Sequence, residues 1–204
     1  MKVELINDNK SVDVNENESL FDILKKYMDD YTDYPGVKVN NRLQELVNAK
    51  FKENDKIEFL SIRDNDGHRI YVRTLTMIYI KACKDIFPEI DVEIKHSLNK
   101  GLYTEPGHKH IVNKSQLKKI KKRMQEIIDE KRPINTMFLS LDKAEKIFSE
   151  QGMNDKVELF KYWDKDTIRV YELDGYYDTF YGYLAPNTGF INKFDLRLFY
   201  PGII

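Results

Sequence analysis

Polar side chains that could bind a ligand gather around one predicted bend, in residues 94–106. An alternating strand leads into Asn99, Lys100 and Gly101, and asparagine and glycine tolerate the positive φ angles of a tight hairpin. The ligand-binding candidates in this stretch are Lys95, His96, Lys100 and Tyr103. The plainer alternative is a well-formed turn with a packed tyrosine.

A second cluster is basic and falls in residues 114–132, which hold eight basic and three acidic side chains. Apolar residues at helical spacing, among them Ile120 and Met124, predict an amphipathic helix that Pro133 ends. The candidate RNA or phosphate contacts are Lys118, Lys119, Lys121, Lys122 and Arg123. Lysines opposite an apolar stripe are also what an ordinary solvated helix face carries.

Three further residues have side chains that bind metals or react. His108 and His110 lie on one side of an extended segment and could form half of a metal site. Two histidines without a nearby cysteine or carboxylate pair are more often surface residues. Cys83 falls in an apolar helix, where a buried, inert thiol is the expected state.

Composition limits the classes of function. The chain has 204 residues, 41% of them hydrophobic, and a net charge near −1, so any basic surface must be local. One cysteine excludes an internal disulfide and fits a reducing compartment. The start lacks the apolar core of a signal peptide, and no run reaches transmembrane length. We therefore expect a cytoplasmic protein with no membrane partner.

Residues 1–62 form a separate acidic unit, with nine basic and thirteen acidic residues. Strands are predicted at residues 3–6, 10–14, 37–39 and 57–62. Ser19 opens a helix with Asp22 at capping-box spacing. This order of elements predicts a β-grasp, ubiquitin-like fold.

Residues 63–204 are predicted to form a second α+β unit, with residues 63–67 as a polar boundary. A long, largely buried central helix is expected over residues 70–86, packed on an antiparallel sheet. Further helices are predicted over residues 114–132 and 141–151. Strands are predicted over residues 136–139, 167–173, 176–183 and 190–200, with Asp174 and Gly175 as a hairpin turn.

Two stretches of the first unit, VKVNNRLQEL and KENDKIEFL, resemble the TGS domain of threonyl-tRNA synthetases. Further on, KKRMQEIIDEKRP and LSLDKAEKIFSEQGMNDKVELF resemble the second additional, editing-type domain of threonyl- and alanyl-tRNA synthetases. The second resemblance implies an editing-like α+β fold for residues 63–204.

Active editing domains carry His-x-x-x-His on the central helix and Cys-x-x-x-His on a later strand. The resemblance places these positions on Arg73, Met77, Phe180 and Leu184. Since arginine, phenylalanine and leucine do not ligate zinc, it implies a degenerate site with neither metal nor catalysis. A guanidinium in such a pocket needs a partner, so Arg73 is expected to pair with Asp178 or to bind a phosphate or nucleotide. The alternative is that Arg73 points into solvent and the former site is a packed relic that binds no ligand.

IKHSLNKGLY, together with a TGS and editing-like pair, resembles the N-terminal half of the clostridial-type uridine kinase family. The resemblance implies a P-loop kinase domain as a partner in the same polypeptide, using ATP and Mg²⁺. No Gly-x-x-x-x-Gly-Lys-Ser/Thr pattern occurs here, so we expect no cofactor in this chain, and a truncated piece or split gene without the kinase domain.

Two functions are compatible with these features. In the first, the chain is a non-catalytic accessory half of a nucleoside kinase that binds a small ligand or docks the kinase domain. In the second, it is a module that retains a synthetase-like contact with the acceptor end of tRNA. The acidic first unit and near-zero net charge predict weak RNA affinity, because phosphate contacts need a local positive excess.

Overall fold

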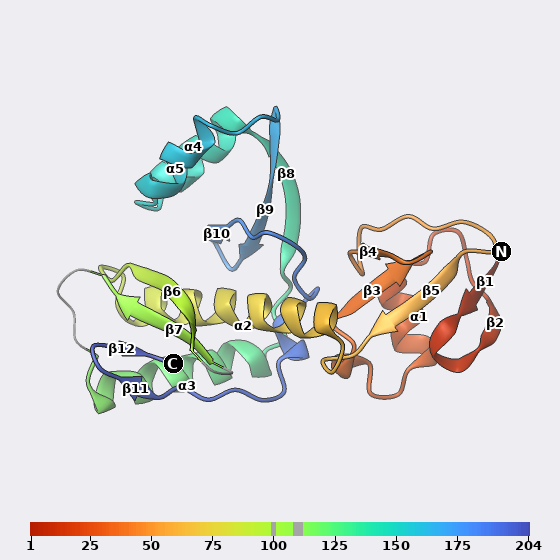
Figure 1. Ribbon diagram of the computed structural model, residues 1–204, viewed down its shortest axis with the longest axis horizontal. Helices are drawn as coiled ribbons and strands as arrows, with labels where there is room; N and C mark the ends of the chain where they lie inside the picture. Colours follow the sequence, from red (N-terminus) through yellow and green to blue (C-terminus); the bar gives the residue numbers. More distant parts are fainter. Residues whose placement is uncertain (99–100, 108–111) are drawn as a thin grey trace.

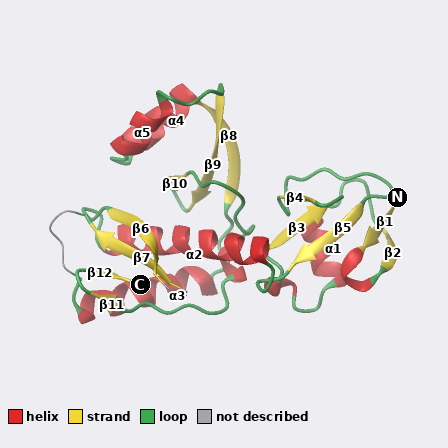
Figure 2. Ribbon diagram, in the orientation of Figure 1, coloured by secondary structure: helices red, strands yellow, loops and turns green. Residues whose placement is uncertain are grey.

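The structure, a computed structural model, describes residues 1–98, 101–107 and 112–204. Within them the strands form sheets of five, three and four strands, with helices beside each (Figures 1 and 2). This arrangement confirms the predicted α+β class. In the described part of the chain, no helix is long and apolar enough to cross a membrane.

The five-stranded sheet is built from the first part of the chain. Its order is β2-β1-β5-β3-β4, in which β1 and β5 are parallel, as a β-grasp requires. The helix α1 has the predicted capping box, and the Asp22 amide donates to Ser19 Oγ at 3.1 Å. The elements are β1 (Lys2–Leu5), β2 (Lys10–Asp13), α1 (Leu20–Tyr27), β3 (Gly36–Val39), β4 (Arg42–Gln44) and β5 (Lys56–Leu60).

The longest helix, α2 (Asn65–Ile86), begins earlier than the predicted residue 70. The polar segment 63–67 is therefore not simply a linker, because it contains the first turn of α2. Gly67 permits this start: a Cβ there would lie 2.0 Å from the carbonyl oxygen of Ser61. The turn that ends the first sheet and the start of α2 thus pack directly against each other.

Helix α2 packs beside α3 (Lys114–Asp129) and against a four-stranded sheet of order β11-β12-β7-β6 (Figure 1). The strands are β6 (Val92–Leu98), β7 (Gly101–Pro106), β11 (Leu198–Phe199) and β12 (Gly202–Ile203). β6 and β7 form the predicted antiparallel pair. Asn99 and Lys100, at the predicted turn, lie outside the described residues.

The third sheet has the order β10-β9-β8 and extends away from α2, with α4 and α5 at its far end (Figure 1). Its elements are β8 (Asn135–Ser140), α4 (Leu141–Glu150), α5 (Asn154–Phe160), β9 (Thr167–Leu173) and β10 (Tyr176–Asp178). β9 links two cores, because Ile168 and Val170 lie in the core beneath α4 whereas Tyr171 and Leu173 join the core of α2 and α3.

Two strand predictions are wrong. β10 ends at Asp178 and does not extend to residue 183, and of residues 190–200 only Leu198–Phe199 is a strand. Thr188–Phe190 is a short 3₁₀ helix instead. The side chains of this short helix contact separate parts of the molecule. The Thr188 hydroxyl donates to the Ile127 carbonyl at 2.7 Å, and Phe190 is fully buried in the core of the five-stranded sheet.

Candidate functional site

The structure brings the four positions of the degenerate metal site close to one core. Met77 on α2 and Leu184 are buried in the same apolar cluster, and Phe180 packs against it with its ring 6.2 Å from that of Tyr171. Arg73 lies one turn before Met77. Across residues 1–98, 101–107 and 112–204, no group of three or more His, Cys, Asp or Glu side chains could hold a metal ion. The residues at these positions do not fit a zinc site.

The side chain of Arg73 is half-buried and makes no hydrogen bond or ion pair with any residue the structure describes. Its guanidinium lies over Gly182, where an added Cβ would be 2.6 Å from Arg73 Cζ. Burial lowers the pKa of Arg73, and the neighbouring charge of Arg69 lowers it further. A positive charge at this position is therefore costly.

The predicted Arg73–Asp178 pair is wrong. Asp178 is almost fully buried and already has its own partners. Its carboxylate is paired with Lys156 and accepts the Tyr176 hydroxyl at 2.8 Å. It also accepts the Thr179 amide at 2.6 Å. Because Lys156 already neutralises this carboxylate, Asp178 is not left to pair with Arg73.

Arg169 on β9 contacts the loop that contains Gly182 and Tyr183. The sequence analysis did not identify Arg169 as a candidate. One terminal nitrogen donates to the Tyr171 hydroxyl at 3.3 Å and lies 3.8 Å from a carboxylate oxygen of Glu45. Its guanidinium also lies 4.5 Å from the ring centre of Tyr183. Arg169 Nε is buried without a hydrogen-bond partner among the described atoms. In the sequence Arg169 looks like any outward position of an alternating strand, so no signal distinguished it.

The hairpin candidates mostly contact one another. Lys95 is paired with Glu93 and lies 3.6 Å from Glu105. Tyr103 is buried, with its ring tilted against that of His96 at 5.2 Å between the ring centres, and its hydroxyl donates to Glu105 at 2.8 Å. Lys100 lies outside the described residues. The described side chains thus form a packed, internally paired surface.

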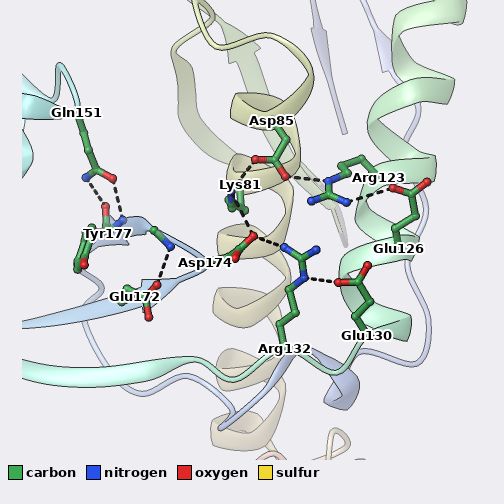
Figure 3. A network of polar contacts seen from close by, with 11 residues as sticks. Lys81, Asp85, Arg123, Glu126, Glu130, Arg132, Gln151, Glu172, Asp174 and Tyr177 are labelled. Carbon is green, nitrogen blue, oxygen red and sulfur yellow. Dashed lines mark hydrogen bonds and ion pairs between the residues drawn. The ribbon is translucent and has the colours of Figure 1, made fainter.

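The basic candidates on α3 divide into paired and unpaired residues. Lys121 pairs with Asp195 at 2.6 Å and Lys122 with Glu126 at 3.7 Å. Arg123 is held inside a network that links α2 and α3 (Figure 3). Lys118 and Lys119 are exposed, and neither is in an ion pair within the described part of the chain. These two lysines remain available to an external anion.

The reactive side chains noted in the sequence do not form a site in the described residues. Cys83 is buried, and burial raises the pKa of its thiol to about 12, which keeps it protonated and unreactive. His108 and His110 lie outside the described residues.

The fold and this site define an α+β protein that has a β-grasp sheet and a core centred on α2, with no zinc ligand set at the expected positions. No protein-family profile matches the chain. It is similar to the threonine–tRNA ligase of Alkalilimnicola ehrlichii, 28% identical over 161 residues and 78% of this chain. It is also similar to those of Syntrophotalea carbinolica, 29% identical over 77% of this chain, and Francisella tularensis subsp. novicida, 23% identical over 78%.

The chain spans about a quarter of the length of these curated relatives, since each alignment covers 25% of the relative. The similarity supports the predicted resemblance to threonyl-tRNA synthetases. The predicted membership of a uridine kinase family gains no support from these relatives.

Proposed function

We propose that this chain is an RNA-binding module whose ligand is a tRNA, and that it acts by binding and not by catalysis. The observation that carries the proposal is the similarity to threonine–tRNA ligases along 78% of the chain. The names of those relatives specify tRNA as a substrate. The alternative of an accessory half that docks a kinase domain is not favoured by any of these relatives.

Helix α3 supplies the surface for this proposal. Lys118 and Lys119 are adjacent and exposed, and in the described part of the chain neither is neutralised by a carboxylate. Binding to a phosphate backbone depends on cations that displace condensed counterions. A solvated pair of lysines on a rigid helix meets this requirement, whereas Arg123 is already neutralised by Asp85 and Glu126.

The test is fluorescence anisotropy with a labelled tRNA over a range of salt concentrations. We expect the double variant Lys118→Gln/Lys119→Gln to bind more weakly and to lower the salt slope by about 2, since each lost phosphate contact lowers it by about 1. The matched control is Lys143→Gln/Lys146→Gln, which removes the same charge from two exposed positions of α4.

If the two double variants lose the same affinity for tRNA, the loss comes from the lower net charge alone, and the proposed role of α3 is wrong. If the unaltered protein binds tRNA no better than serum albumin does in the same assay, the RNA-binding function itself is wrong.

A further inference from the structure

A cavity of about 640 Å³ lies where α2, α3, the β6–β7 pair and residues 195–204 meet (Figure 1). It is on a different face of α2 from Arg73 and Met77, because residues three and four apart lie on the same side of a helix. The residues of α2 that line it are Val72, Leu75, Thr76 and Tyr79. The cavity is therefore separate from the positions of the degenerate zinc site.

Apolar side chains that are only half-buried surround this cavity. Protein interiors contain few voids larger than a water molecule, and apolar surface in contact with water is unfavourable. The cavity is within the size range of small-molecule sites, about 300–1,000 Å³, and such sites have mostly apolar walls. A ligand with an apolar part would cover surface that the fold leaves open to water. The half-buried apolar residues come from α2, β6, β7 and the C-terminal segment, and they are Val72, Leu75, Leu98, Leu102, Leu196 and Ile204.

The hydroxyl groups inside the cavity are already bonded to the protein. The hydroxyls of Tyr79 and Thr104 lie 2.9 Å apart, and that of Thr104 also donates to the Ile203 carbonyl at 3.3 Å. The Thr76 hydroxyl donates to the Val72 carbonyl at 2.8 Å. Burial raises the pKa of Tyr79, so its phenol stays neutral. The interior thus offers a ligand neither a charge nor an unused hydroxyl donor, and the part of the ligand that enters it is apolar.

Positive charge exceeds negative charge among the side chains at the mouth of the cavity. Asp195 and Arg197 are exposed and belong to the lining. The Asp195 carboxylate accepts Lys121 Nζ at 2.6 Å and Arg197 Nε at 3.2 Å, and these two bonds lower its pKa to about 2. The two cations share this one carboxylate, and the terminal nitrogens of Arg197 make no hydrogen bond or ion pair with the described residues. The fork of an arginine suits a carboxylate.

We propose that this cavity binds a small carboxylate with an apolar chain or ring, such as a medium-chain fatty acid. The apolar part lies inside the cavity, and the carboxylate lies at the mouth beside Arg197. The site uses neither Lys118 nor Lys119, so it stands or fails separately from the proposed RNA binding.

The test is isothermal titration of the protein with decanoate below its micellar concentration. We expect decanoate to bind, and decan-1-ol, which has the same chain without the charge, to bind more weakly. Leu75→Trp fills the cavity from α2 with an apolar ring and should weaken decanoate binding by at least about tenfold. Leu102→Trp, from β7, should do the same and replaces Leu75→Trp if that variant misfolds. The matched control is Leu159→Trp on α5, at a side chain that is 64% exposed.

Arg197→Gln tests the position of the carboxylate. We expect it to weaken decanoate binding by about two- to fivefold, the range for an ion pair at a solvent-exposed arginine, and to leave decan-1-ol binding unchanged. Arg42→Gln removes the same charge from an exposed residue of β4 that makes no ion pair within the described part of the chain. It should leave the binding of both compounds unchanged.

Circular dichroism of each variant confirms that the fold is intact. If decanoate does not bind, or binds Leu75→Trp as tightly as Leu159→Trp, the cavity is not a ligand site. If decan-1-ol binds as tightly as decanoate, the carboxylate makes no contribution and the proposed ligand class is wrong. Analytical ultracentrifugation tests whether a second copy of the chain covers the cavity instead. A dimer that Leu75→Trp converts to a monomer, and that decanoate leaves intact, would overturn the proposal.

Discussion

Individual side chains explain why the positions on α2 and in the loop after β10 that correspond to the zinc ligands of editing domains are unsuited to zinc. Met77 is fully buried, and Leu184 and Phe180 fill the adjoining apolar core. We expect purified protein to contain no stoichiometric zinc, because three of the four positions carry side chains that cannot ligate it. Elemental analysis by mass spectrometry measures this directly. One tightly held zinc per chain after dialysis against a chelator would contradict the prediction.

The same residues show what a sequence can predict about a site. The positions of Arg73 and Met77 on one helical face follow from their spacing of four residues. The partner of Asp178 does not follow from sequence spacing, because Lys156 reaches Asp178 from another helix, α5. Arg169 became a candidate only when β9 placed it beside Tyr183 and Tyr171. Contacts between distant segments decide which charges remain unpaired.

Among the elements, α2 and α3 are joined by an ion-pair network as well as by their apolar faces (Figure 3). The Asp85 carboxylate accepts Lys81 Nζ at 2.6 Å and Arg123 Nε at 2.8 Å. Burial raises the pKa of Asp85, but the hydrogen bonds from Lys81 and Arg123 together outweigh it, so the pKa is lowered. The stabilisation is therefore present above the unfolded-state pKa and is lost as pH falls through the folded-state value.

We expect Asp85→Asn to lower the free energy of unfolding at neutral pH by about 1–2 kcal/mol, since it weakens charged hydrogen bonds that solvent partly screens. Between about pH 5 and about pH 2 the variant should lose less stability than the unaltered protein. Urea denaturation at several pH values measures both effects. Asp8→Asn, in the exposed pair with Lys10, is the control. An Asp85→Asn curve parallel to that of the unaltered protein at acid pH would rule out this role.

Elements with local signals were predicted well, and elements that depend on distant contacts were not. The capping box at Ser19 and the hairpin turn at Asp174 are set by neighbouring residues, and both occur as expected. In contrast, residues 190–200 have a strand-like composition but no neighbouring edge to pair with along most of their length. Phe190 and Ile191 enter two different cores instead.

Across the whole molecule, the two predicted units share a core, although the division into residues 1–62 and 63–204 stays a prediction. Ile70, Ala185 and Phe190 belong to the second unit by sequence but are buried in the core of the five-stranded sheet. Asn192 also donates to the Asp33 carboxylate at 2.8 Å. A unit of about 60 residues is marginally stable alone, so this contribution matters for the first unit.

Phe190 is the strongest test of this coupling. It is fully buried, with its ring 5.7 Å from that of Phe21 and 5.9 Å from that of Tyr31. We expect Phe190→Ala to lower the free energy of unfolding by about 3–5 kcal/mol, from lost burial and the cavity left behind. Hydrogen exchange with mass spectrometry should show faster exchange in β1, β3 and β5, which are distant from Phe190 in the sequence. Phe138→Ala, at a ring that is 68% exposed, should leave those strands unchanged. If protection in the first sheet is the same in Phe190→Ala as in the unaltered protein, the two units are stable independently and the shared core contributes little.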